Sequence, residues 1–483
     1  MNDLRVLSVA SECSPLVRTG GLGEVVGSLP AALARHGIAM RVLLPRYRGL
    51  GPGLGDVREV AHWTDLPGGE GRLLRARHAC GLELYLLDMP QLFDRPGGPY
   101  RDADGHDHPD NALRFAALGM AAARIAREGV AGFPVDVLHA HDWQAGLAPA
   151  FLALGPEPRP KSLFTIHNLA YQGWFEAAWL PQLQLPPASF SIHGVEYYGG
   201  IGFLKAGLFY ADRITTVSPT YAREIATPAQ GMGLDGLLRA RAADLEGILN
   251  GLDTTVWDPT ADRFLAETYD AGCLELRQEN RRVLERRFRL EADHGSPLFA
   301  AIGRLVHQKG FDLLLARLPS LVARGGRLIL LASGDPELEA AFKEAVRRYP
   351  GQVGCIFAHD EEVAHQIQGG ADALLVPSRF EPCGLVQLAA LRYGCVPVVA
   401  RTGGLADTVV DASPMALARD AATGIQFSAG DEWGLEIGLQ RAFELWRRPE
   451  LWQRLQTVGM AEPVGWERPA AAYARLYREL VAA

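Results

Sequence analysis

Short runs rich in Leu and β-branched residues alternate along this chain with longer amphipathic stretches, and the pattern starts again near the middle. Such alternation is typical of strands and helices that form an open, mostly parallel sheet covered by helices. The length of 483 residues also exceeds what one hydrophobic core normally holds. We therefore predict an α/β protein with two doubly wound, Rossmann-like domains.

The positions of the strands and helices follow from the same pattern. In the first half we expect strands near 4–10, 40–45, 83–89, 135–141, 161–166, 213–218 and 245–250, with helices near 21–35, 110–129 and 200–211. In the second half we expect strands near 297–303, 326–333, 353–358, 371–377 and 396–400, with helices near 310–323, 336–348, 361–369 and 384–393.

The join between the two halves is expected near 251–275, where Gly, Asp and Pro interrupt the pattern. We assign an N-terminal domain to 1–255 and a C-terminal domain to 256–455. The remaining segment, 456–483, is helical in pattern and is expected to cross back to the first domain. Ligands of open α/β sheets bind beyond the carboxyl ends of the strands, so we expect a deep cleft between the domains.

Composition excludes several classes of function. The net charge of −8 argues against a broad basic surface for nucleic acid. The six cysteines form no Cys-x-x-Cys pair, which argues against a zinc ribbon or a redox motif and fits reduced thiols. Neither a basic leader nor an apolar run of about 20 residues is found, so we expect no signal peptide and no membrane span. A cytoplasmic protein is expected.

The same five letters, Arg-Thr-Gly-Gly-Leu, follow a predicted strand in each half, at 18–22 and at 401–405. Glycine lets backbone N–H groups approach an anion closely, and a following helix N-terminus favours negative charge. The first loop lacks the spacing of a dinucleotide fingerprint, since Val26 occupies the third glycine position. Each loop alone also fits a tight turn, and the recurrence could be coincidence. We interpret the pair as two loops that face one phosphate-bearing ligand.

Charged residues near two strand ends of the second half fit the same ligand. Arg304 and Lys309 lie five residues apart ahead of a predicted helix, an arrangement that suits a diphosphate, although surface cations would look the same. Glu381 follows the strand near 371–377 and precedes a helix whose amides, near Gly384 and Leu385, could receive a phosphate oxygen. Alternatively, Glu381 only stabilises the dipole of that helix.

Three polar motifs are weaker signals. His167 ends a predicted strand, where a structural, hydrogen-bonded histidine is as natural as a catalytic one. The run 139–142, His-Ala-His-Asp, resembles a metal cluster, but consecutive strand residues point to opposite faces and cannot all converge on one ion. Asp102 and Asp104 form an Asp-x-Asp pair in a polar loop that we interpret as solvated.

The motifs, in their order and spacing, resemble those of the bacterial glycogen synthases and plant starch synthases, which have the two-domain GT-B fold. The resemblance covers nearly the whole chain and is carried by Ser11-Glu12 and by the segments 18–22, 141–147, 165–173, 247–253, 308–310, 333–336 and 377–385. By contrast, no Walker-type Gly-Lys-Ser/Thr and no Gly-x-Ser-x-Gly elbow supports an NTPase or a hydrolase.

The resemblance implies a hexosyltransferase of glycogen biosynthesis. Such an enzyme transfers glucose, with retention of anomeric configuration, from ADP-glucose to the non-reducing 4-OH of an α-1,4-glucan primer. No metal or other cofactor is expected, no membrane or nucleic-acid partner is expected, and the oligomeric state is not indicated. The implied catalytic residues are Glu381, His167, Arg304 and Lys309. The implied substrate-binding residues are Glu12, Arg18, Thr19, Gly20, Gly21, Glu24, Asp142, Asn250, His359, Cys383, Gly384, Leu385, Thr402 and Gly403.

Three positions depart from the family pattern. Arg18 stands where the family usually has Lys, Glu24 where it has Asp, and His359 where it has a Tyr that stacks on adenine. These departures leave two alternatives open. One is a GT-B transferase with an altered donor, such as UDP-glucose, or a small maltooligosaccharide acceptor. The other is a glucan-binding protein that has lost catalysis.

Overall fold

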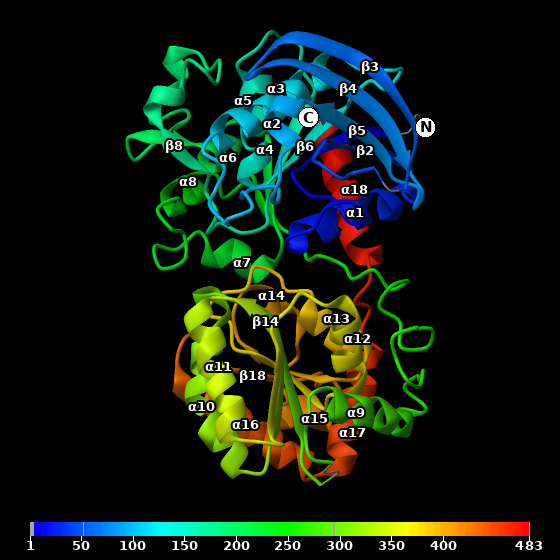
Figure 1. Ribbon diagram of the computed structural model, residues 1–483. Helices are drawn as coiled ribbons and strands as arrows, with labels where there is room; N and C mark the ends of the chain where they lie inside the picture. The colour runs from blue at the N-terminus through cyan, green and yellow to red at the C-terminus, as the bar shows by residue number, and fades with distance from the viewer. Residues whose placement is uncertain (1–3, 52, 293–294, 483) are drawn as a thin grey trace. The chain divides into compact units, whose positions relative to one another are not determined.

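The computed structural model describes residues 4–51, 53–292 and 295–482. The chain divides into two compact units, each built as an α/β sandwich (Figure 1). Unit 1 comprises residues 1–250 together with 466–483, and unit 2 comprises residues 251–465. The predicted α/β class with two doubly wound sheets is therefore confirmed. The sequence predicts that the first domain ends at 255 and that the segment returning to it begins at 456. In the structure these boundaries lie at 250 and 466.

Unit 1 is organised around a nine-stranded sheet of the described residues, in the order β12-β11-β7-β6-β1-β2-β5-β4-β3. Neighbouring strands are parallel from β12 to β5, whereas β4 pairs antiparallel with both β5 and β3. The strands are β1 (Leu4–Val9), β2 (Ile38–Pro45), β3 (Leu54–Leu66), β4 (Gly69–His78), β5 (Glu83–Asp88), β6 (Val137–His141), β7 (Lys161–Ile166), β11 (Arg213–Thr216) and β12 (Leu245–Gly247).

Helices flank this sheet, and a small sheet of order β8-β10-β9 lies apart from it. The small sheet comprises β8 (Trp174–Glu176), β9 (Glu196–Tyr197) and β10 (Gly200–Gly202). The α-helices of unit 1 are α1 (Gly21–Ala34), α2 (Pro90–Phe93), α3 (Asn111–Glu128), α4 (Asp142–Ala145), α5 (Leu147–Ala153), α6 (Phe203–Tyr210), α7 (Pro219–Glu224), α8 (Asp235–Ala240) and α18 (Glu467–Ala482). Two 3-10 turns, η1 (Ala177–Trp179) and η2 (Pro187–Ser189), complete it.

The C-terminal helix α18 belongs to unit 1, although the rest of that unit ends more than 200 residues earlier. In Figure 1 the red α18 lies beside the blue α1, although the two helices come from opposite ends of the sequence. Its apolar side, which includes Tyr473, Leu476 and Tyr477, is buried in a cluster with Leu29 and Leu33 of α1. The last helix therefore completes the core on one face of the first sheet.

The described residues of unit 2 form a six-stranded parallel sheet of order β15-β14-β13-β16-β17-β18. Its strands are β13 (Leu298–Leu305), β14 (Arg327–Gly334), β15 (Val353–Ile356), β16 (Ala373–Val376), β17 (Val396–Ala400) and β18 (Ile425–Phe427). Its helices are α9 (Arg277–Arg287), α10 (Phe311–Ala323), α11 (Pro336–Arg348), α12 (Glu361–Gly370), α13 (Val386–Arg392), α14 (Gly403–Thr408), α15 (Pro414–Ala418), α16 (Glu432–Trp446) and α17 (Pro449–Met460), with 3-10 turns η3 (Leu274–Leu276) and η4 (His307–Lys309). Separate apolar clusters fill the two faces of the sheet.

Two parts of the sequence-based prediction were wrong. The antiparallel β3–β4 hairpin was missed because β3 is exposed along most of its length, so it lacks the apolar run that marks a buried strand. The expected helix 200–211 begins only at Phe203, since residues 200–202 pair as β10 with the small sheet. Both errors concern strands whose pairing partners, and not their own hydrophobicity, define them.

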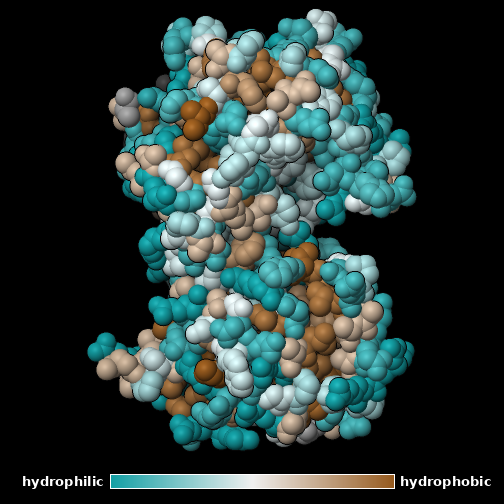
Figure 2. All heavy atoms as spheres, turned by 90° about the vertical axis from the view of Figure 1, so that its left-hand side faces the viewer, coloured by the Kyte–Doolittle hydropathy of each residue, from teal (hydrophilic) through white to brown (hydrophobic). Residues whose placement is uncertain are grey.

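The surface of the molecule is mixed in character. On the face shown in Figure 2, hydrophilic side chains predominate and smaller hydrophobic areas lie among them. None of the helices in the described ranges has the length and apolar character needed to cross a membrane.

The packing of α18 gives a test of its contribution to unit 1. We expect Leu476→Ala to lower the free energy of unfolding of this unit by about 2–5 kcal/mol, because the side chain is 1% exposed and its loss leaves a cavity. Urea unfolding measures the change. The matched control is Val481→Ala on the same helix, which is 47% exposed and should change stability by less than about 0.5 kcal/mol. Equal losses from the two variants would contradict this account.

Candidate functional site

Glu12 organises the first glycine loop. It follows β1 and is 3% exposed. Its carboxylate accepts hydrogen bonds from the Thr19 backbone N–H at 2.5 Å, the Thr19 hydroxyl at 2.6 Å and the Gly20 N–H at 3.2 Å. The hydroxyl of Tyr100, which also pairs with Ser11 at 2.8 Å, donates to the same carboxylate. The loop at 18–22 is therefore held by a buried anion of the protein itself.

Arg18 and Glu24, two of the three departures from the family pattern, form an ion pair with each other. Both side chains are 24% exposed. Arg18, in place of the family's Lys, and Glu24, in place of its Asp, thus pair within one loop–helix segment. Between them lie Gly20, where an added Cβ would meet no heavy atom within 4 Å, and Gly21, the first residue of α1. The backbone at Gly20 consequently faces open space.

Asp142 and His167 meet at the carboxyl ends of β6 and β7. The Asp142 carboxylate accepts from the backbone N–H groups of His167 at 2.7 Å and Asn168 at 3.3 Å. Burial is the main reason that the Asp142 pKa is raised to about 7, and the two N–H donors oppose the shift. Burial also lowers the pKa of His167 to about 3, so this imidazole is neutral near pH 7.

A series of buried hydrogen bonds fixes the position of the His167 ring. His167 Nε2 is 3.0 Å from His141 Nδ1, and His141 Nε2 is 3.1 Å from the Ser8 hydroxyl. The ring of His139 lies 4.0 Å from that of His141 between centroids, and its nitrogens bond Tyr477 at 2.7 Å and Thr165 at 2.6 Å. Burial lowers the pKa of both His139 and His141 well below the usual range, so these two imidazoles are uncharged near pH 7.

Asn250 is the last predicted site residue of unit 1. It is 7% exposed, and its side-chain oxygen has no hydrogen-bond partner within the described part of the chain. A buried amide oxygen without a donor is uncommon in folded proteins, and it marks a position that a ligand hydroxyl could satisfy.

In unit 2 Glu381 and Lys309 form an ion pair. Lys309 Nζ lies 2.5 Å from Glu381 Oε2, and the Ser378 hydroxyl donates to the same oxygen at 3.0 Å. Glu381 is 5% exposed. The ion pair requires glycine at position 310. Gly310 has a φ of +67°, and a Cβ added there would lie 2.1 Å from the Pro377 carbonyl oxygen. The segment that carries Lys309 can therefore lie directly against the segment that carries Glu381.

Arg304 lies inside β13, whereas the sequence placed it in the loop after the strand. Its side chain is exposed. Between Arg304 and Lys309 the chain forms the short turn η4, so both cations occupy the carboxyl end of β13. His359 also follows a strand, β15, and is exposed.

The second glycine loop packs against the Glu381 segment. An added Cβ at Gly403 would lie 1.9 Å from the Glu381 carbonyl oxygen, and one at Gly404 would lie 2.3 Å from that of Cys383. The Gly404 N–H donates to the Glu381 carbonyl at 3.0 Å. These glycines are required for contact between two protein loops, and this N–H is directed at the protein. Thr402, 3% exposed, precedes α14, while Gly384 and Leu385 precede α13, which begins at Val386.

Several residues of this arrangement were not predicted. Tyr100 binds Glu12 from 88 positions away, His141 binds His167, and Ser378 binds Glu381. The only local signal was for Ser378, three residues before Glu381. Within the described ranges no group of three or more His, Cys, Asp or Glu side chains could hold a metal ion, and Asp102 accepts N–H bonds from its own loop.

The raised pKa of Asp142 gives a prediction for stability against pH. The folded chain keeps a proton on this carboxyl that the unfolded chain releases as pH rises from about 4 to about 7, so the contribution of this group to stability falls over that window and is constant above it. We expect Asp142→Asn to remove this fall. Urea unfolding of both proteins at about pH 4 and about pH 8 measures it. Parallel pH profiles for wild type and variant would contradict the assignment.

The comparisons with known proteins cover both units. Residues 5–240 match the family described as the starch synthase catalytic domain, and residues 283–432 match the glycosyl transferases group 1. A glycogen synthase of Rhodopseudomonas palustris strain HaA2 is 56% identical over 482 residues, which is 100% of each chain. A glycogen synthase of Methylocella silvestris is 51% identical over 481 residues, covering 100% of this chain and 99% of the relative.

Solved structures agree with these relatives. The catalytic domain of starch synthase IV from Arabidopsis thaliana, bound to ADP and acarbose, matches with a TM-score of 0.88 and 30% identity over 99% of this chain and 100% of that chain. Sucrose-phosphate synthase from Thermosynechococcus elongatus matches with a TM-score of 0.61 at 19% identity, which supports the GT-B fold alone. The whole length of the sequence, and not only its motifs, therefore places this chain in the glycogen synthase and starch synthase family of GT-B glycosyltransferases.

Proposed function

We propose that this glycogen synthase family member transfers glucose from ADP-glucose to the non-reducing 4-OH of an α-1,4-glucan, with retention of configuration. The observation that carries the proposal is identity above 50% with curated glycogen synthases over the full chain. The starch synthase IV neighbour, bound to ADP and to acarbose, supports a nucleotide donor and a glucan acceptor.

In this proposal the cations of unit 2 stabilise the leaving diphosphate. Breaking the glucosyl–phosphate bond increases negative charge on the phosphate oxygens, and cations fixed in advance lower the energy of that state. Lys309 and Arg304 lie at the same strand end, and Lys309 is held in place by Glu381. We propose on this basis that the reaction uses neither a metal nor another cofactor, since the two cations supply the positive charge.

The residues of unit 1 are proposed to bind the glucosyl group. His167 is neutral because burial lowers its pKa to about 3, so it serves as a hydrogen-bonding group and not as a source of protons. The side-chain oxygen of Asn250 provides a further polar contact. The acceptor proton then passes to the leaving phosphate in a front-face displacement, without a covalent sugar ester on a carboxylate.

The altered-donor alternative keeps one observation in its favour. His359 replaces the expected tyrosine and is exposed after β15, so stacking on adenine would use a smaller ring. Arg18, by contrast, is paired with Glu24, which supports a loop that has adapted to both substitutions together.

A donor panel separates the two donors. We expect kcat/KM with ADP-glucose to exceed that with UDP-glucose by about tenfold or more, measured as nucleoside diphosphate released in the presence of glycogen. Omitting the glycogen is the control, and it should reduce release to background. A preference for UDP-glucose would favour the alternative.

Removal of the proposed diphosphate contact gives a second test. We expect Lys309→Ala to lower kcat by about 100–1,000-fold, because a preorganised charge is lost and Glu381 is left without its cation. Steady-state kinetics with ADP-glucose and glycogen measures this loss. Lys343→Ala is the matched control, since Lys343 also pairs with a glutamate in unit 2, at 3.4 Å, but is 55% exposed on α11. Equal kcat values for the two variants would refute the assigned role.

A further inference from the structure

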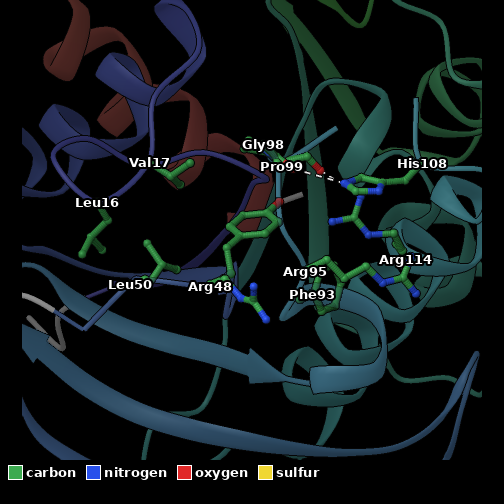
Figure 3. A pocket seen from close by; sticks show the side chains of 13 residues that line it. Leu16, Val17, Arg48, Leu50, Phe93, Arg95, Gly98, Pro99, His108 and Arg114 are labelled. Carbon is green, nitrogen blue, oxygen red and sulfur yellow. Dashed lines mark hydrogen bonds between the residues drawn. The ribbon is translucent and has the colours of Figure 1, made fainter. Parts of the chain in front are cut away.

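A hollow lies in unit 1 beside the residues that precede Arg18, and we call it the Tyr47 hollow. Its volume is about 130 Å³. Figure 3 shows side chains from separate segments of unit 1 around it, including Leu16, Arg48, Arg95 and Arg114. The described residues that line it are Leu16, Val17, Tyr47, Arg48, Gly49, Leu50, Phe93, Arg95, Gly97, Gly98, Pro99, His108 and Arg114. These lining residues are not among those assigned to glucosyl transfer, and Leu16 and Val17 directly precede Arg18.

The lining offers hydrogen-bond donors on cationic side chains and no carboxylate side chain. Three of its residues are arginines. Arg48 pairs with Asp94 and Arg95 pairs with Asp110, but these two aspartates do not line the hollow. Arg48 and Arg95 are therefore balanced by carboxylates outside the lining, and Arg114 remains as the cation to be accounted for.

Arg114 is the strongest part of this positive lining. It is 1% exposed, and its guanidinium donates to the carbonyls of Leu92 and Pro99, each at 2.9 Å, and to the side-chain oxygen of Asn111 at 2.6 Å. All three acceptors are neutral. A buried cation whose hydrogen bonds go to neutral groups is stabilised further by an anion close by.

Tyr47 adds a donor without an acceptor. The residue is 9% exposed, and within the described part of the chain its buried hydroxyl has no hydrogen-bond partner. Its ring is held edge-on against Phe93, with centroids 5.8 Å apart. Burial raises the pKa of the hydroxyl above its ordinary value, so it keeps its proton and can donate. A buried hydroxyl without a partner is costly, and an oxyanion would satisfy it.

We propose that the Tyr47 hollow binds a small oxyanion with the chemistry of a phosphate group. An oxyanion accepts hydrogen bonds only, and this matches the Tyr and Arg donors of the lining. A neutral sugar would not balance the charge of the buried Arg114, whereas an oxyanion would. Because the hollow includes Leu16 and Val17, the anion would bind next to the Arg18 loop.

Isothermal titration of the full-length chain with orthophosphate tests this proposal. ADP is present at saturation throughout, so that the proposed donor site is already filled. We expect wild type to bind one orthophosphate under these conditions. Tyr47→Phe and Arg48→Gln should each weaken the binding by about tenfold, because each removes one donor to a charged group.

The matched control is Arg124→Gln. Arg124 is also ion-paired in unit 1, with Asp65 at 2.6 Å, but does not line the hollow, so its variant should bind orthophosphate as wild type does. Thermal unfolding gives a second readout. Without orthophosphate Tyr47→Phe should melt at or above the wild-type temperature, because the lost hydroxyl had no partner. Only wild type and Arg124→Gln should gain the full stabilisation from orthophosphate.

Two outcomes would overturn the proposal. The first is no binding of orthophosphate to the ADP-saturated wild type. The second is unchanged affinity in either Tyr47→Phe or Arg48→Gln. Each would count against an oxyanion site in unit 1 while leaving the glucosyl-transfer proposal intact, since catalysis is assayed separately with ADP-glucose and glycogen.

Discussion

A carboxylate buried at the end of a parallel strand must be surrounded by hydrogen-bond donors, because an uncompensated charge is too costly away from water. Each unit of this chain is arranged around such a group. Glu12 collects donors from Thr19, Gly20 and Tyr100, while Glu381 collects them from Lys309 and Ser378. The loops that carry the candidate site are positioned by satisfying these two anions.

The two Arg-Thr-Gly-Gly-Leu loops consequently use their glycines differently. At Gly20 an added side chain would find open space, while the Gly20 N–H donates to Glu12. At Gly403 and Gly404 an added Cβ would strike the backbone of Glu381 and Cys383. The same five residues therefore leave open space at Gly20 in unit 1 and allow close packing in unit 2. In unit 2 the second loop supports the Glu381 segment.

The neutral histidine chain under His167 connects the candidate site to the C-terminal helix. His141 holds the ring of His167, and its neighbour His139 is hydrogen-bonded to Tyr477 of α18. Because burial keeps these imidazoles uncharged, they can orient one another without repulsion. The C-terminal helix α18 therefore supports the histidines that position His167 as well as the hydrophobic core of unit 1.

The sequence by itself determined the α/β class, most of the buried strands and the family, because hydrophobic periodicity and motif spacing are local properties of the chain. It also showed that Arg18 and Glu24 both depart from the family pattern. Only the tertiary structure decided that those two side chains pair, that Tyr100 reaches Glu12, and that the exposed β3 joins the sheet. These features depend on contacts between distant segments, and the energy of such contacts is set by burial and hydrogen-bond partners that no local pattern encodes.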